Sequence, residues 1–257
     1  MKRFLMAASF SVLMAGCGGG GDETELPAAE ALCSSIGLTP KVLNGTNCSQ
    51  PERASVILLN VQSTSGTSVC SGTLIAPTKI LTAAHCLPAG TSRVLAGVWS
   101  ASGSVVGRPA RAWAVHPQFT RTTSALVNDA AVIVMSSPMP NPTMAVMVGS
   151  TSSAGQGVYI AGWGAPGFDL AVGFTTLSAV SETSLRYSYS GALSNTCSGD
   201  SGGPVYRHAG GRPAVVGITS SGTASSCGDG EVSLSTNVQS PAVINFIRAQ
   251  APEASYL

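Results

Sequence analysis

Short apolar runs alternate with polar turn segments from about residue 55 onward. The runs hold three to five residues, several of them β-branched, and segments such as Ser63-Thr64-Ser65-Gly66 separate them. This pattern is typical of strands in packed antiparallel sheets or barrels. It predicts strands at residues 55–59, 79–81, 131–134, 157–160, 214–218 and 232–236.

The end of the chain has a different period. Ser240-Pro241 offers an N-cap residue followed by a first-turn proline, a combination that favours the start of a helix. Apolar residues then recur at helical spacing, at Val243, Ile244, Phe246 and Ile247. We therefore expect a C-terminal helix.

The first residues have the pattern of an export signal. Met1-Lys2-Arg3 is basic, and residues 4–14 form an apolar stretch that is too short to span a membrane. Met14-Ala15-Gly16-Cys17 resembles a bacterial lipobox, in which cleavage precedes a lipid-modified cysteine. The alternative is an ordinary signal peptide cut near Ala15 or Gly16. We expect residues 1–16 to be removed and Cys17 to carry lipid, followed by a Gly-rich, acidic linker.

Composition narrows the function classes. Only 10% of the residues are charged, the formal net charge is +1, and no basic block occurs, so nucleic acid is not an expected partner. Seven cysteines are an odd number for an exported chain, in which disulfides form readily. If Cys17 carries lipid, the others can pair among themselves, and the residues alone leave the pairing open. These are Cys33, Cys48, Cys70, Cys86, Cys197 and Cys227.

Three short motifs hold the residue types of a nucleophilic triad. Residues 197–204 read Cys-Ser-Gly-Asp-Ser-Gly-Gly-Pro, and glycines around one serine let backbone N–H groups face an oxyanion. His85 lies in the motif Thr-Ala-Ala-His-Cys, and Asp129 precedes an apolar, β-branched run. A serine nucleophile needs a histidine base, which in turn needs an orienting carboxylate. Ser201, His85 and Asp129 are therefore candidates for these roles.

The order histidine, aspartate, serine resembles that of the trypsin/chymotrypsin family of serine proteases and differs from the orders in α/β-hydrolases and subtilisins. The segments TAAHC, NDAAVIV and CSGDSGGP resemble the three catalytic blocks of that family. The resemblance extends over nearly all of residues 42–257, including Gly162-Trp163-Gly164 and Thr219-Ser220-Ser221-Gly222. It implies an all-β fold of two packed six-stranded antiparallel β-barrels with a C-terminal α-helix.

The resemblance also implies a role for each catalytic residue. Ser201 would attack the scissile carbonyl, and His85 would accept its proton and later donate it to the leaving amine. Asp129 would fix the imidazole tautomer, with Ser220 supporting it. The N–H groups of Gly199 and Ser201 would bind the oxyanion.

Two disulfides follow from the resemblance. Cys70–Cys86 would clamp the loop that bears His85, and Cys197–Cys227 would brace the substrate pocket. Cys33 and Cys48 then remain to pair with each other.

The segment Lys41-Val42-Leu43-Asn44-Gly45 resembles the activation site of the family. Cleavage after Lys41 would free an α-ammonium on Val42 that pairs with Asp200 and orders the oxyanion loop. Leu43 and Asn44 depart from the commonest pair at these positions. The alternative is that Lys41 is an exposed linker residue. A Cys33–Cys48 disulfide would keep the cut enzyme joined to its anchor.

The sequence says less about which substrate side chain the pocket accepts before the scissile bond. Asn195 stands where the family has its pocket floor, and a neutral residue there favours a neutral substrate side chain. Asp229 and Glu231 lie nearby in the sequence and could supply negative charge for Arg or Lys. The other expected pocket residues are Thr196, Ser220, Gly222 and Ser233.

The prediction is an exported, lipid-anchored serine endopeptidase made as a zymogen, with residues 1–16 as signal peptide, 17–41 as linker and propeptide, and 42–257 as protease domain. One alternative is an esterase or a highly restricted processing protease with the same triad. Another is a catalytically silent binding module, although such proteins usually lose a triad residue. We expect protein or peptide substrates, an activating protease, attachment to the membrane of a bacterial envelope, a monomer, and neither cofactor nor metal.

Overall fold

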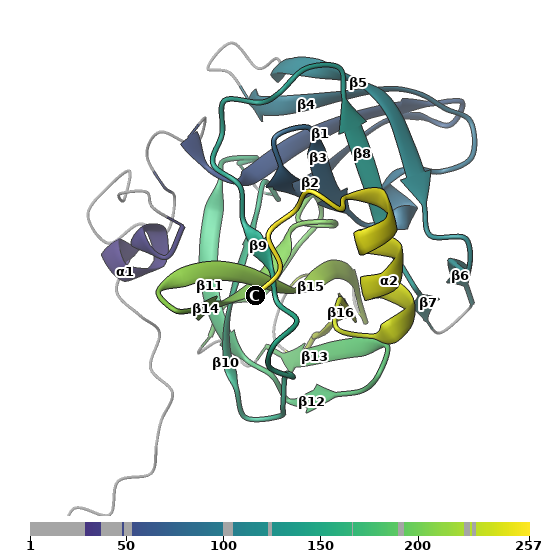
Figure 1. The fold of residues 1–257 in the computed structure, drawn as a ribbon. Helices are drawn as coiled ribbons and strands as arrows, with labels where there is room; N and C mark the ends of the chain where they lie inside the picture. The colour runs from purple at the N-terminus through teal and green to yellow at the C-terminus, as the bar shows by residue number, and fades with distance from the viewer. Residues whose placement is uncertain are drawn as a thin grey trace, which may run out of the picture.

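A computed structural model describes residues 29–36, 48, 53–99, 105–122, 125–165, 167–189, 193–223, 227 and 230–257. The leader, Cys17, Lys41 and Val42 lie outside these ranges. Within them the regular structure is mostly β, in two large sheets and one two-stranded hairpin, with short helices at either end (Figure 1). In this described part, neither helix has the length and apolar character needed to cross a membrane. The all-β prediction is confirmed.

The first sheet is a closed six-stranded barrel in the order β1-β2-β3-β8-β5-β4. Neighbouring strands are antiparallel, and apolar side chains of β1 and β8 are buried on the inside. Gly97 and Gly107 face each other where β4 and β5 pair, and a Cβ on either would overlap the backbone of the other strand. The barrel strands are β1 (Val56–Ser63), β2 (Gly66–Ala76), β3 (Lys79–Thr82), β4 (Thr91–Trp99), β5 (Val105–Val115) and β8 (Ala131–Met135).

The second sheet curls into a barrel-like layer below the first (Figure 1). It has eight strands, in the order β11-β10-β14-β15-β16-β13-β12, with β9 paired in parallel to β15. β9 and β12 hold only two residues each. The strands are β9 (Ala145–Val146), β10 (Gly157–Gly162), β11 (Ala171–Thr176), β12 (Ala179–Val180), β13 (Ser184–Ser188), β14 (Pro204–Ala209), β15 (Arg212–Gly222) and β16 (Val232–Asn237).

Each terminal helix packs on the barrel that is more distant in sequence. Helix α1 (Ala29–Ser34) lies against β11, with Leu32 and Cys33 fully buried. Helix α2 (Pro241–Gln250) follows the second barrel yet packs on β8 of the first (Figure 1). The smaller elements are η2 (Ala84–Cys86) and the hairpin of β6 (Thr120–Arg121) and β7 (Leu126–Val127).

The strands expected at six places in the sequence correspond to β1, β3, β8, β10, β15 and β16, and the C-terminal helix corresponds to α2. The helix has proline in its first turn and Ser240 at the N-cap position, but the serine side chain makes no capping hydrogen bond. Ser240 contributes instead through its carbonyl, which accepts the N–H of Ile244.

Three disulfides cross-link the described residues, Cys33–Cys48, Cys70–Cys86 and Cys197–Cys227. The last two are the pairs that the resemblance implied, and the first is the pair that then remained. Trp163, which is 1% exposed, donates its indole N–H to the carbonyl of Val56 and so connects the two barrels. Segments from both barrels meet at this boundary, where the candidate catalytic residues lie.

Candidate active site

His85 and Asp129 are held together at the edge of the first barrel. His85 lies in η2 directly after β3, and Asp129 directly precedes β8, which pairs with β3. The Asp129 side chain is fully buried. One oxygen, Oδ1, accepts the backbone N–H of His85 at 2.8 Å, and Oδ2 lies 2.7 Å from His85 Nδ1. This contact favours the tautomer that carries its proton on Nδ1, which leaves Nε2 as a base.

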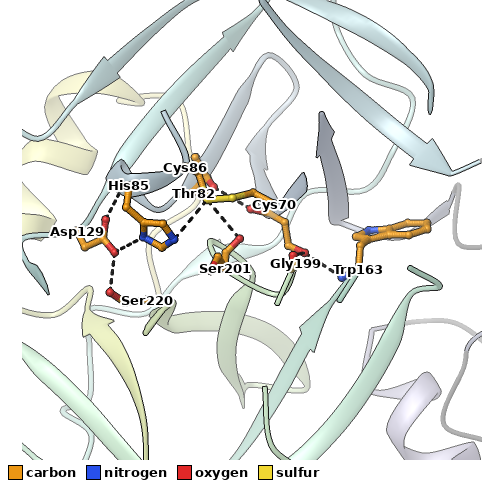
Figure 2. The surroundings of a disulfide bond; sticks show 10 residues. Cys70, Thr82, His85, Cys86, Asp129, Trp163, Gly199, Ser201 and Ser220 are labelled. Atoms are coloured by element: carbon orange, nitrogen blue, oxygen red, sulfur yellow. Dashed lines mark hydrogen bonds and ion pairs between the residues drawn. A yellow bond between two sulfur atoms is a disulfide. The ribbon is translucent and has the colours of Figure 1, made fainter. Parts of the chain in front are cut away.

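Ser220 adds a third hydrogen bond to this carboxylate. Its Oγ donates to Asp129 Oδ2 at 2.6 Å from β15 of the second barrel. The Asp129 carboxylate therefore takes donors from both barrels, and this fixes the imidazole plane. Figure 2 shows the ring between Asp129 on one side and Ser201 on the other.

Ser201 reaches the site on the loop before β14. Its carbonyl accepts the N–H of Ser71 at 2.8 Å, which anchors the loop to the first barrel. The hydrogen bonds found among the described residues do not include one between Ser201 Oγ and His85 Nε2. Such bonds are often long without substrate and tighten when it binds. The Cys70–Cys86 disulfide lies beside the pair, with Cys86 Sγ 4.0 Å from His85 Nε2 (Figure 2).

The loop around Ser201 depends on two glycines. Gly199 has φ +99° and Gly202 has φ +84°, and Cβ atoms there would meet backbone of the neighbouring segments. The Gly199 carbonyl accepts the hydroxyl of Ser71 at 2.8 Å. Across the described ranges, the N–H groups of Gly199 and Ser201 donate to no other backbone group. Both donors are therefore available to a ligand.

Ser71 and Thr82 contribute to this loop and were not singled out in the sequence. Ser71 Oγ also accepts the N–H of Trp163 at 2.9 Å, so it links three segments. Thr82 Oγ1 donates to the Ser71 carbonyl at 2.8 Å. Thr82 lies within the histidine motif and Ser71 follows Cys70. This closeness to motif residues is the only feature of the sequence that could have pointed to them.

Asp200 lies beside a cavity of about 120 Å³. Its carboxylate accepts the N–H groups of Gly164 and Cys197, each at 2.8 Å. Burial raises the pKa of Asp200 to about 6, against the lowering effect of these two hydrogen bonds. Cβ atoms on Gly162 or Gly164 would overlap the carboxyl group, so both glycines are needed for this placement. The cavity is lined mainly by apolar and small residues of β10 and β11.

A second cavity, of about 140 Å³, opens beside Ser201. Among the expected pocket residues, Thr196, Ser220 and Gly222 line it. Asn195 lines the cavity of Asp200 instead, and Ser233 is 1% exposed behind the pocket. Glu231 also lines the second cavity.

A chain of polar side chains connects these residues. Asn195 Nδ2 donates to Glu231 Oε2 at 3.2 Å, and Asn195 Oδ1 accepts the hydroxyl of Ser233 at 2.6 Å. Thr196 Oγ1 lies 3.1 Å from Ser233 Oγ and 3.3 Å from the hydroxyl of Tyr187. Burial raises the pKa of Tyr187, so its hydroxyl stays protonated. Tyr187 was not anticipated, because nothing in its local sequence connects it with Thr196, nine positions further along the chain.

Comparisons with known proteins agree with this geometry. The family model described as Trypsin matches residues 42–247. Trypsin alpha-4 of Lucilia cuprina is 29% identical over 184 residues, covering 62% of this chain and 69% of the relative. Trypsin alpha of Drosophila erecta is 32% identical over 168 residues, covering 55% of this chain and 64% of the relative. The chain thus spans about two thirds of the length of these relatives.

The fold agrees with a solved structure as well. HL collagenase superimposes with a TM-score of 0.68 at 17% identity, covering 82% of this chain and 99% of that one. At this identity the likeness concerns the fold alone. The family model spans most of the chain, including both barrels and the motifs of His85, Asp129 and Ser201, and on this ground the chain belongs to the trypsin family.

Proposed function

We propose that this protein is a serine endopeptidase in which Ser201, His85 and Asp129 form the catalytic triad. The observation that carries the proposal is the fully buried Asp129, whose carboxylate orients the His85 ring through Nδ1 at 2.7 Å. Nε2 then accepts the proton of Ser201 as its oxygen attacks the scissile carbonyl. The same proton passes to the leaving amine, and water hydrolyses the acyl-enzyme by the reverse sequence.

The N–H groups of Gly199 and Ser201 are the proposed donors to the oxyanion. Support comes from the positive φ of Gly199 and from the Ser71 hydroxyl, which donates to the Gly199 carbonyl and fixes that peptide group. Donors fixed in this way stabilise negative charge that develops during attack.

Activation by cleavage after Lys41 is the second part of the proposal. The new ammonium of Val42 would enter the cavity beside Asp200 and neutralise its carboxylate. Support comes from the size and lining of that cavity, and from the burial that raises the pKa of Asp200. A buried carboxylate with no positive partner is unfavourable, so the incoming charge would stabilise this loop.

Export and attachment to a bacterial envelope through lipid on Cys17 complete the proposal. Disulfides indicate an oxidising compartment. Mass spectrometry of the mature N-terminal peptide tests the anchor: a lipid mass on Cys17 supports it, and an unmodified terminus near residue 15 or 16 contradicts it.

A fluorophosphonate probe tests the catalytic proposal. The chain cut after Lys41 should be labelled on Ser201, whereas the Ser201→Ala variant and the uncut chain should be labelled far less. Absence of labelling in the cut chain would contradict the enzyme reading and favour a silent binding module. Peptide hydrolysis by the labelled form distinguishes an endopeptidase from an esterase.

The Cys33–Cys48 disulfide has a consequence for the cut enzyme. The two cysteines flank the proposed cleavage site, so the N-terminal segment should stay attached to the protease domain after cleavage. Reducing gels of the active enzyme should show two fragments, the larger beginning at Val42, and non-reducing gels a single band. Separation under both conditions would contradict the tether.

A further inference from the structure

Glu231 is a buried carboxylate next to the candidate substrate pocket. It is 4% exposed and lines the cavity beside Ser201. Within the described ranges its only side-chain hydrogen bond is the one from Asn195 at 3.2 Å, and no lysine, arginine or histidine lies within ion-pair distance. Burial of a carboxylate without a positive partner is unfavourable. A ligand with positive charge would supply the missing partner.

Asn195 is poorly placed to select the substrate itself. Its amide donates to Glu231 and its carbonyl accepts from Ser233, so both ends of the group are already engaged. It lines the cavity of Asp200 rather than that beside Ser201. The neutral amide therefore holds Glu231 in position, and the charge at the pocket comes from Glu231.

The remaining groups at this end of the pocket also suit a cation. The hydroxyls of Thr196 and Ser233, 3.1 Å apart, have oxygen lone pairs that can accept N–H donors. Tyr187 adds another hydroxyl 3.3 Å from Thr196. An acidic substrate side chain would be repelled by Glu231, and an apolar one would leave this polar end unpaired.

We propose that Glu231 determines the substrate class, selecting Lys or Arg before the scissile bond. The inference rests on the proposed protease function and departs from the neutral preference that Asn195 alone suggests. The carboxylate comes from the segment before β16, whereas Asn195 and Thr196 come from the segment before Ser201. The ammonium or guanidinium would lie between Glu231 and the hydroxyl of Thr196, both of which line the cavity.

Steady-state kinetics on the cut enzyme test this with peptides that differ only in the residue before the bond: Lys, Arg, Gln or Leu. We expect kcat/KM to be highest for Lys and Arg. Glu231→Gln should lower kcat/KM for these two by about a hundredfold, the size typical for removal of one partner of a buried charge pair. It should change the Gln and Leu peptides little. Glu182→Gln, at an exposed acid, is the matched control and should change none of them.

Two further variants test whether the preference for Lys and Arg depends on a carboxylate in the cluster of Asn195 and Glu231 or on Asp229. Asn195→Asp in the Glu231→Gln background should restore part of the preference for Lys and Arg, because it returns a carboxylate to the same cluster. Asp229→Asn should leave the preference intact. Loss of the preference in Asp229→Asn with its retention in Glu231→Gln would overturn the proposal, as would a wild-type preference for Gln or Leu.

A binding measurement separates this inference from catalysis. Calorimetry with benzamidine, a flat amidinium, on cut Ser201→Ala protein should show binding that Glu231→Gln weakens by about tenfold or more. Equal binding by both proteins would contradict the role of Glu231. Failure of wild-type Ser201 to react with a fluorophosphonate would contradict the proposed function, whereas a reactive enzyme without preference for Lys and Arg would contradict only this inference. The labelling rate of Glu231→Gln shows whether that variant is folded.

Discussion

At the residue scale, Asp129 is a fully buried carboxylate that is satisfied by donors from two barrels. The backbone N–H of His85, the His85 ring and the Ser220 hydroxyl all contact its two oxygens, at 2.6–2.8 Å. The histidine is therefore oriented by a group that has little freedom to move.

Asp129→Asn tests this orientation. An amide in place of the carboxylate turns one acceptor into a donor, which favours the wrong imidazole tautomer. We expect kcat to fall by about 10⁴, the size known for this change in a related triad. Fluorophosphonate labelling and peptide kinetics measure it, and Glu182→Gln, at an exposed position, serves as the control. A loss below about tenfold would contradict the role of Asp129.

Asp200 makes the stability of the uncut chain depend on pH. Its pKa is about 6 in the folded chain, above the ordinary value of 3.8, so the folded state holds the proton more tightly. The free energy of unfolding should then fall as pH rises from about 4 to about 6, by at most about 3 kcal/mol. Urea unfolding of uncut Ser201→Ala across this range tests the sign, with Asp200→Asn as the comparison.

Cleavage after Lys41 should reverse this sign. An ammonium beside Asp200 lowers the pKa of the carboxyl, so the folded chain then gains stability as pH rises through the acid range. An unchanged pH dependence in cut protein would argue against insertion of Val42 into the cavity.

At the element scale, the pairing of β4 with β5 depends on small residues at one crossing. Gly97 and Gly107 are direct partners, and a Cβ on Gly97 would overlap the carbonyl of Val106 and the Cα of Gly107. Backbone atoms of a closed barrel cannot shift as a side chain can.

Gly97→Ala should therefore destabilise the protein by about 1–3 kcal/mol, the usual range for overpacking. Gly149→Ala is the matched control, because its Cβ would lie at an ordinary 3.4 Å from Leu257. Urea midpoints of both variants in the Ser201→Ala background give the comparison. Equal midpoints would show that β4 and β5 can separate at this point without loss.

Local sequence predicts some of these elements well and others poorly. The β-branched run of β8 and the Ser-Pro start of α2 can be predicted from the local sequence, because their patterns reflect local backbone preference and burial. Helix α1 holds only six residues and is stabilised by burial of Leu32 and by a disulfide. Such an element depends on tertiary contacts and has little local signal.

The same division holds for the site. The motifs of His85, Asp129 and Ser201 identify candidates, because each motif has an unusual composition. The contact between Asn195 and Glu231 joins residues 36 positions apart through a loop and a strand edge. The pairing of β13 with β16 and the Cys197–Cys227 disulfide bring these segments together, so the sequence leaves the pocket charge open.

At the scale of the whole molecule, α2 links the two barrels. His116 Nε2 lies 3.2 Å from the carbonyl of Ala242, and the His116 ring packs 4.9 Å from that of Phe246. Lys79 Nζ lies 2.6 Å from the carbonyl of Gln250 at the other end of the helix. The helix thus fixes the second barrel to the first on the side opposite α1.

Phe246→Ala tests this linkage. Removal of a buried aromatic ring should lower the free energy of unfolding by about 3–5 kcal/mol. Asn245→Ala, at the neighbouring exposed position, should change it by less than about 0.5 kcal/mol. Urea unfolding followed by circular dichroism measures both, and a loss below about 1 kcal/mol in Phe246→Ala would show that α2 is dispensable.

The docking of α1 has a mechanical consequence. A pull on the N-terminal side of α1 first reaches Cys33, whose disulfide passes it to Cys48. It then reaches Ser35, which contacts Tyr206 at 2.6 Å and His208 at 3.0 Å in β14. Cys48 in turn donates its N–H to Leu170, next to β11. The load is therefore carried by a covalent bond and by β11 and β14, neither of which bears His85 or Asp129. Tension applied through the proposed anchor at Cys17 would therefore enter the fold next to β11 and at β14, and not at the elements that carry His85 and Asp129.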